Sequence, residues 1–356
     1  MWKECCVLPF FSLLLTGKRW YYIIYSDYIY CKGRAFLNSG KSLIIFDTDI
    51  GGDCDDAGAL ALCHALCDLD EASLLAVTCC YATPYVAGCV DAINKYYGRS
   101  VPVGVNYDRE YLSEIKYCDG YFGYDRPICE LFPNDYKVYA GIPDSLEVLR
   151  KTLADSEDDS VTLVATGYLS SFAKLILSDA DEFSPLSGRE LIAKKVRQTV
   201  VMGGRFFEGW PGDYLYAGAP VVTEYNIRSD IKAAQCVCDN WPGKLIFSSF
   251  EIGTACMSLK YFHRLADKNP AAMSYKLHPS ASVSGRESWD LTAMLQAIRP
   301  DRGYWKLSAC GKINVSDEGV TSFEADETGK HYFLLPDAPE SVIRDTMESL
   351  IYNCSR

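Results

Sequence analysis

Five aspartates stand close together in residues 43–60, which read LIIFDTDIGGDCDDAGAL. They are Asp47, Asp49, Asp53, Asp55 and Asp56. Carboxylates this close repel one another, and each raises the pKa of its neighbours unless a cation is shared among them. Calcium binds oxygen ligands in flexible geometry, whereas zinc sites usually include histidine or cysteine. The cluster therefore predicts a calcium site, with magnesium as the alternative.

The acidic segment follows a predicted strand and opens a predicted helix. Residues 43–46 show no polar alternation, which is typical of a parallel strand that is covered on both faces. Residues 50–52 predict a tight turn, and the apolar spacing in residues 57–66 predicts a helix. The acids should therefore lie at the carboxyl end of a strand and at the start of a helix.

Three other interpretations fit parts of this cluster. Some of the acids could serve only as helix caps and dipole partners, each stabilising the helix by about 0.3 to 1 kcal/mol. An EF-hand loop that starts at Asp49 would need a bidentate glutamate where this chain has Leu60. In a phosphatase of the haloacid dehalogenase type, Asp47 and Asp49 would be nucleophile and acid. That interpretation leaves Asp55 and Asp56 without a role.

Four later segments complete a recognisable pattern. They are VTLVATGYLSSFAKLI (161–176), VVMGG (200–204), TEYNIRSDIKAA (223–234) and ESWDLTAML (287–295). Together with DTDIGGDCDD, and in this order and spacing, they resemble the inosine-uridine preferring nucleoside hydrolase family. The resemblance covers residues 41–297, and the acidic turn is longer by two residues than the shortest form in the family.

This resemblance implies calcium-dependent hydrolysis of the N-glycosidic bond of ribonucleosides. Asp49 looks like the metal-binding base that activates water. Asp56, the backbone carbonyl of Thr166, and Asp290 look like the other calcium ligands. Such a bond breaks through a sugar of oxocarbenium character, which surrounding carboxylates stabilise. Asp290 could alternatively be a helix cap.

The resemblance also implies how ribose would be held. Asp55 looks like the acid that binds the 2′-hydroxyl, and Glu224 and Asn226 look like the pair that binds the 5′- and 3′-hydroxyls. Tyr225 stands where the family usually has phenylalanine. Asn226, like Asp290, could instead be a helix cap.

The clearest departure from the family pattern is Trp289, where many members have a histidine proposed to protonate the departing base. An indole N–H only donates a hydrogen bond and cannot act as a general acid at neutral pH. Trp289 therefore resembles the purine-specific branch, in which an aromatic ring stacks on the base; a core or lid aromatic is the alternative. Candidate partners for the stack are Tyr121, Phe122, Tyr124, Phe206, Phe207 and Trp210.

A second departure lies in the loop after VVMGG. Several family members have asparagine where this chain has Gly218. One sugar contact is therefore in doubt, and Trp210, Asp213 or Tyr216 could replace it. This difference bears on the choice of substrate more than on the metal.

The chain as a whole predicts one large α/β domain at residues 41–356, with an open, mostly parallel sheet flanked by helices as in nucleoside hydrolases. Residues 1–40 are a leader or an unassigned extension. Past residue 299, the segments KINVSDEGVTSF (312–323) and KHYFLL (330–335) predict a small β-hairpin, and a C-terminal helix is expected at 341–352. The other expected strands are at 74–78, 101–105, 161–165, 199–202 and 245–248, and helices are expected at 86–97, 169–177 and 231–238, with a further one capped at Asp144.

Composition limits the kinds of partner and the cellular compartment that the protein can have. The net charge of −12 argues against binding of nucleic acid, whereas a neutral nucleoside needs no basic surface. The sixteen cysteines favour free thiols in a reducing compartment, but residues 7–15 resemble a signal-peptide core that is too short to span a membrane. Localisation stays open. The resemblance implies a homodimer or homotetramer.

Three classes of function remain open. The first is a calcium-dependent nucleosidase that prefers purines. The second is a hydrolase of another ribosyl compound or a modified nucleoside. The third is a nucleoside-binding relative without catalytic activity.

Overall fold

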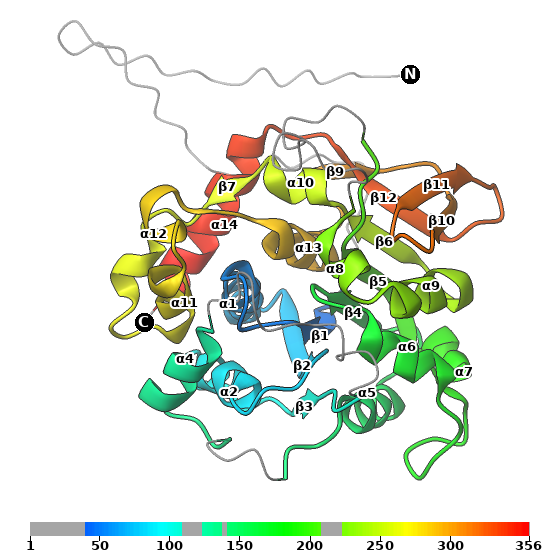
Figure 1. The fold of residues 1–356 in the computed structure, drawn as a ribbon, viewed down its shortest axis with the longest axis horizontal. Helices are drawn as coiled ribbons and strands as arrows, with labels where there is room; N and C mark the ends of the chain where they lie inside the picture. Colours follow the sequence, from blue (N-terminus) through cyan, green and yellow to red (C-terminus); the bar gives the residue numbers. More distant parts are fainter. Residues whose placement is uncertain (1–39, 109–122, 137–140, 208–222, 356) are drawn as a thin grey trace, which may run out of the picture. The chain divides into compact units, whose positions relative to one another are not determined.

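The computed structural model describes residues 40–108, 123–136, 141–207 and 223–355, and its centre is a ten-stranded, mostly parallel sheet (Figure 1). The strands are β1 (Ser42–Thr48), β2 (Ala72–Cys79), β3 (Val103–Val105), β4 (Val161–Ala165), β5 (Val196–Met202), β6 (Leu245–Ser248), β9 (Trp305–Leu307), β10 (Gly311–Val315), β11 (Thr321–Ala325) and β12 (His331–Pro336). Their order is β11-β10-β12-β6-β5-β4-β1-β2-β3, and β9 pairs with β12. The predicted α/β fold with an open, mostly parallel sheet is confirmed.

The adjacent inner strands β1 and β4 are buried on both faces. All residues of β4 are buried, and β1 pairs in parallel with both β4 and β2. Side chains alternate along β1, so that Ile44 and Phe46 join one hydrophobic core while Ile45 joins the other. This explains the unbroken apolar run in the sequence.

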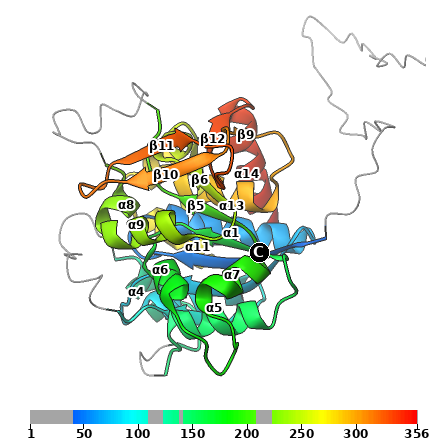
Figure 2. The same cartoon turned by 90° about the vertical axis from the view of Figure 1, so that its right-hand side faces the viewer.

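Six helices enclose the core that contains Phe46 (Figures 1 and 2). They are α1 (Asp55–Asp68), α2 (Val86–Tyr96), α4 (Asp125–Leu131), α11 (Pro270–Leu277), α13 (Trp289–Ile298) and α14 (Glu340–Cys354). The helix α1 contacts β2 together with α13 and α14, so almost all of its side chains are buried. This burial fixes the start of α1, where the acidic turn ends.

Four helices enclose the second core, which contains Ile45. They are α5 (Ser145–Ala154), α6 (Ser170–Leu177), α7 (Gly188–Lys195) and α9 (Ile231–Asn240). Asp144 caps α5 by accepting from the backbone N–H of Leu146 at 2.8 Å. Shorter elements connect these layers: α8 (Tyr225–Ser229), α10 (Phe250–Thr254), the antiparallel pair β7 (Met257–Ser258) and β8 (Arg286–Glu287), the 3-10 helix at Phe262–Leu265, and α12 (Ala281–Ser284).

The C-terminal hairpin exists, but its neighbour differs from the expectation. β10 and β11 form the antiparallel hairpin. The segment KHYFLL, which the sequence assigns to the hairpin, forms β12; it pairs antiparallel with β10 at Gly311 and His331, as expected, and it also pairs in parallel with β6. Leu334 of β12 is fully buried, and Phe333 stacks on Phe206 with ring centroids 4.8 Å apart. An apolar strand of this kind is stable inside the sheet because both of its faces are covered.

The cysteines behave as small apolar residues. All twelve described cysteines are free thiols, as expected, and most are buried. Among the described helices, none has the length and apolar character needed to cross a membrane.

Replacing Leu163 in β4 by alanine should lower the free energy of unfolding by about 2 to 5 kcal/mol, because the fully buried side chain leaves a cavity. Urea denaturation followed by circular dichroism measures this loss. The matched control is Leu177→Ala at the exposed end of α6, which should change stability by less than about 0.5 kcal/mol. Equal losses for both variants would contradict the assignment of β4 to the core.

Candidate functional site

The predicted site residues gather at the carboxyl edge of the adjacent strands β5, β4 and β1. Asp49 follows β1, Thr166 follows β4, and Gly203 follows β5. The helices α1 and α13 carry Asp55 and Asp290 in their first turns. Open α/β sheets bind ligands at this edge, beyond the ends of their strands.

Three buried carboxylates form a cluster at this edge. Oxygens of Asp55, Asp56 and Asp290 lie within 4.8 Å of one another. The backbone N–H of Asp290 donates to Oδ2 of Asp55 at 3.1 Å, which joins the first turns of α13 and α1. Asp56 accepts from the hydroxyls of Thr48 and Thr166, the latter at 3.1 Å. Segments far apart in the sequence therefore converge on one group of oxygen atoms.

Asp49 adjoins this carboxylate cluster. Burial and then repulsion from Asp56 and Asp55 raise the pKa of its carboxyl well above the usual value. Gly167 allows the approach, because a Cβ at this position would lie 2.8 Å from the Cβ of Asp49. Glycine is therefore required beside Asp49 for steric reasons.

The electrostatics of the cluster fit a hard divalent cation. Burial and mutual repulsion raise the pKa of Asp55 and of Asp290 well above the usual range. Burial raises the pKa of Asp56 to about 7, against hydrogen bonds that lower it. A cation would remove this repulsion, and its ligands would all be oxygens, as magnesium and calcium prefer. The buried cluster of Asp55, Asp56 and Asp290 could therefore hold a metal ion.

Glu224 and Asn226 lie at the start of α8, next to the cluster. Glu224 caps this helix: Oε1 accepts from the N–H of Asn226 at 2.9 Å, and Oε2 accepts from the N–H of Ile227 at 3.0 Å. The helix cap that the sequence left open for Asn226 is thus Glu224. Nδ2 of Asn226 donates to the carbonyl of Thr166 at 2.8 Å. Asn226, a predicted ribose-binding residue, is therefore hydrogen-bonded to Thr166, a predicted metal ligand.

Tyr225 belongs to a row of three aromatic rings, which we call the tyrosine wall. The Tyr225 ring lies 6.2 Å from that of Tyr168, which lies 6.2 Å from that of Tyr81. Asp49 contributes to a raised pKa of Tyr168, after burial, so the wall approaches the carboxylates. No motif in the sequence marks Tyr81 or Tyr168 as site residues, although both follow strand ends in the expected sheet.

Trp289, in the first turn of α13, is half-buried. Its ring stacks on Phe250, with centroids 5.5 Å apart, and the guanidinium carbon of Arg286 lies 4.7 Å from the ring centroid. The indole N–H donates to the carbonyl of Phe250 at 2.9 Å and to the hydroxyl of Thr254 at 3.1 Å. Phe250 belongs to α10, outside every matched motif, so the sequence does not indicate that it stacks on Trp289.

Three of the other stacking candidates have described contacts, and the rest lie outside the described residues. Phe206 and Phe207 both contact Phe333 of β12, and Tyr124 is buried with its backbone N–H on the carbonyl of Gly51. Tyr121, Phe122 and Trp210 lie outside the described residues, as do Gly218, Asp213 and Tyr216.

An ion pair that no sequence motif predicts lies at the edge of the cluster. Asp53, in the acidic turn, binds Arg286 through two nitrogens of the guanidinium. The pair joins the turn before α1 to the strand β8. A charged residue shortly before the last motif is the only sequence signal for it.

A second group of possible metal ligands fits a metal less well. Asp53, Cys54 and His278 lie close together, but Asp53 is paired with Arg286. Nδ1 of His278 accepts from the backbone N–H of Ala281 at 3.3 Å, so we assign the ring proton to Nε2. Burial raises the pKa of the Cys54 thiol well above its usual value. These protonated groups and the guanidinium favour the carboxylate cluster as the metal site.

Fold and site together define a family. The model of the inosine-uridine preferring nucleoside hydrolase family matches residues 44–325, and this chain belongs to that family. A plant nucleoside hydrolase structure shares 17% identity, with a TM-score of 0.63 over 88% of this chain and 98% of the other. An inosine-guanosine nucleoside hydrolase shares 18% identity, with a TM-score of 0.63 over 87% of this chain and 99% of the other.

A further similar structure is the type III effector protein XopQ complexed with adenosine diphosphate ribose. It shares 12% identity, with a TM-score of 0.62 over 89% of this chain and 95% of the other. At such identities these structures establish the fold alone. A comparison with curated proteins found no match.

The metal-free protein should lose stability as the pH rises from about 4 to about 7, because the pKa values of buried Asp47 and Asp56 are raised from 3.8 to about 7. A raised pKa in the folded state stabilises the protein below the unfolded pKa, and this contribution is lost as the pH approaches the folded value. A cation held by the carboxylate cluster would compete with protons for Asp56, so the stabilisation that calcium gives should grow over the same range.

Thermal unfolding with chelator and with calcium, at pH 5 and at pH 7.5, measures this effect. The calcium-dependent rise in Tm should be larger at pH 7.5. A rise that is the same at both pH values would contradict a cation held by these protonatable carboxylates.

Proposed function

We propose that this chain is a calcium-dependent nucleoside N-ribohydrolase that prefers purine ribonucleosides and acts as a homodimer or homotetramer. The observation that carries the proposal is the buried cluster of Asp55, Asp56 and Asp290 beside Asp49. Burial of so many acids is costly unless they bind a cation and a polar substrate. Membership of the nucleoside hydrolase family supports the same reaction.

In this proposal calcium is held by Asp49, Asp56, Asp290 and the backbone carbonyl of Thr166. The bound ion supplies Lewis acidity that makes a water molecule easier to deprotonate. Asp49 takes the proton from that water as it attacks the anomeric carbon. The close packing of Gly167 against Asp49 supports this role, because it fixes the position of the base.

The ribose is held by three polar residues in the proposal. Asp55 accepts from the 2′-hydroxyl, and Glu224 and Asn226 bind the 5′- and 3′-hydroxyls. Nδ2 of Asn226 already donates to Thr166, which leaves Oδ1 as the amide atom suited to accept from a hydroxyl. The negative charges around the ring stabilise the positive charge that develops on the sugar. A 2′-deoxyribonucleoside should therefore be a poor substrate.

Trp289 takes part through its ring rather than through its N–H, which is engaged by Phe250 and Thr254. A purine has a larger stacking surface than a pyrimidine, so a stacking ring favours purine ribonucleosides. Arg286 lies against the same ring and would share it with the base. Tyr225, exposed at the end of the tyrosine wall, would contact the nucleoside from α8.

The alternative is hydrolysis of another ribosyl compound or of a modified nucleoside, or binding of a nucleoside without turnover. The likeness to XopQ, whose structure contains adenosine diphosphate ribose, supports including that compound in the assays. Release of adenine from it by cleavage of its N-glycosidic bond, with no cleavage of nucleosides, would favour the alternative.

Asp49→Asn should lower kcat on inosine by at least about 100-fold, because the variant removes the general base and a metal ligand. Ribose release from inosine, guanosine, uridine and 2′-deoxyinosine, with chelator and after calcium is restored, measures activity. The matched control is Asp179→Asn at an exposed position after α6, which should keep full activity. Near wild-type turnover by the Asp49 variant would remove Asp49 from the mechanism.

Trp289→Leu should reduce turnover of inosine far more than turnover of nitrophenyl riboside, whose leaving group needs no activation by stacking. The ratio of the two kcat/KM values measures the effect. Trp241→Phe, in the core on the opposite face of the sheet, is the control and should not change this ratio. Equal losses on both substrates would refute stacking as activation of the leaving base.

A further inference from the structure

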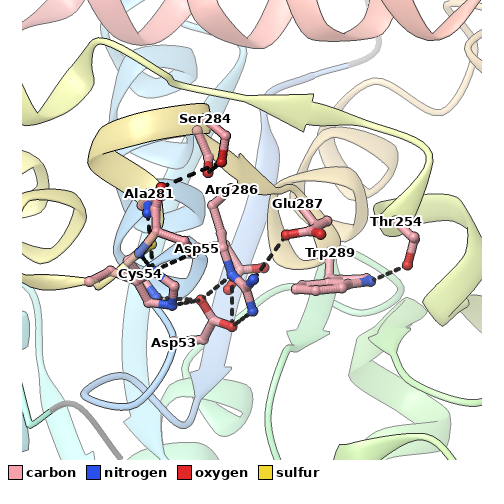
Figure 3. Close-up of polar contacts among 12 residues, drawn as sticks. Asp53, Cys54, Asp55, Thr254, Ala281, Ser284, Arg286, Glu287 and Trp289 are labelled. Atoms are coloured by element: carbon pink, nitrogen blue, oxygen red, sulfur yellow. Dashed lines mark hydrogen bonds and ion pairs between the residues drawn. The ribbon is translucent and has the colours of Figure 1, made fainter. Parts of the chain in front are cut away.

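Arg286 makes contacts with three groups around the start of α13 (Figure 3). Its Nε donates to Oδ1 of Asp53 at 2.8 Å and to Oδ2 at 3.0 Å, and Nη2 also donates to Oδ2. Nη1 donates to Oε2 of Glu287 at 2.9 Å. The guanidinium also lies against the Trp289 ring. A planar fork bonded in this way is held in one orientation.

The backbone that carries Arg286 is fixed as well. Arg286 pairs with Ser258 in the short β7–β8 ladder. Gly285, with a φ of 85°, lets β8 approach closely, because a Cβ there would lie 2.3 Å from the carbonyl oxygen of Ser258. The hydroxyls of Ser258 and Ser288 are 2.6 Å apart and tie β7 to the residue before α13. Arg286 is therefore a rigid anchor for any segment that binds it.

The segment that binds Arg286 is the turn that leads into the carboxylate cluster. Asp53 also accepts from the backbone N–H of Cys54 at 2.7 Å, and the carbonyl of Cys54 accepts from Gly58 in the first turn of α1. Asp55 follows directly and accepts from the N–H of Asp290. Two connections therefore join the starts of α1 and α13, one through Arg286 and one through Asp290.

Charge gives Arg286 a second effect. Arg286 places its positive charge directly against the carboxylate of Asp53, two residues before Asp55. His278 lies 3.7 Å from Asp53, but burial lowers its pKa, so it adds little positive charge at neutral pH. Arg286 is therefore the cation that balances Asp53 next to the metal ligands.

We propose that the Arg286–Asp53 ion pair is a latch that positions the acidic turn for calcium, with Arg286 as a positioning residue. The proposal rests on the proposed function, because it presumes the calcium site. The acidic turn between the end of β1 at Thr48 and the start of α1 at Asp55 belongs to neither element, so it has conformational freedom to lose when it is ordered. The latch removes that freedom by fixing Asp53 to β8, and it keeps the Asp53 carboxylate away from the metal.

The chain offers a matched control at the opposite end of the strands. Arg299, after α13, donates to Glu71, before β2, at 2.7 Å and 2.6 Å. This pair is about as buried as Arg286 and Asp53. It joins α13 to the sheet at the amino ends of β1 and β2, away from the carboxylate cluster.

The experiment measures the Kd of calcium by isothermal titration calorimetry on the full chain after chelation. The wild type is measured first, followed by Asp53→Asn, Arg286→Met, Arg286→Lys, the double variant of Asp53→Asn with Arg286→Met, and the control Arg299→Met. Thermal unfolding of the metal-free variants reports stability separately from calcium affinity. Residues that orient metal ligands from outside typically change affinity by about 10-fold to 100-fold.

The latch predicts that Asp53→Asn and Arg286→Met each weaken calcium binding by about tenfold or more. The double variant should bind calcium no more weakly than the weaker-binding single variant, because both changes break the same interaction. Arg286→Lys should lie between Arg286→Met and the wild type, because lysine keeps the charge but not the fork. Arg299→Met should lower Tm without changing the Kd.

If the wild type binds calcium, three results would overturn the proposal of the latch. These are an unchanged Kd in both single variants, tighter binding by Arg286→Met, or losses that multiply in the double variant. A wild type that binds no calcium would instead overturn the calcium site in the proposed function, and the latch with it. The wild-type titration therefore separates the two failures.

Discussion

Repulsion among buried carboxylates is the constraint on which this structure depends. Four aspartates, Asp49, Asp55, Asp56 and Asp290, meet at one end of the sheet, and burial makes each of them harder to ionise. A fold can keep such a group only if rigid elements hold it together. Here the almost completely buried helix α1 and the helix α13 start at the edge where β1, which is covered on both faces, ends. The hydrophobic cores thus offset the cost of the site.

Much of the site could be predicted because its residues are defined by local pattern. An apolar run that ends in acids predicts a parallel strand whose carboxyl end carries Asp49. Thr166 follows the same kind of run, and both residues lie where the sequence places them. The carboxylate cluster needed only one non-local assumption, that Asp290 returns to this edge, and its N–H does reach Asp55.

The features that sequence could not supply are pairings between distant segments. Asp53 and Arg286 are 233 residues apart, and no periodicity in either segment indicates the partner. Phe250 stacks on Trp289 because α10 packs against α13, which only the tertiary fold determines. The composition of KHYFLL predicts a strand but does not indicate its neighbour. Its pairing with β6 depends on the tertiary fold, which leaves the edge of β6 free to pair.

The place of β12 has a consequence for the order of folding. β12 lies between β6 and the β10–β11 hairpin, and it pairs with β6 across a separation of more than eighty residues. Until β12 arrives, β6 is an edge strand with unpaired backbone groups, which invites pairing with other chains. During synthesis the sheet therefore stays open on this side until residues 331–336 have emerged. Closure of the sheet is a late, non-local and slow step, and the nascent chain is most prone to aggregate just before it.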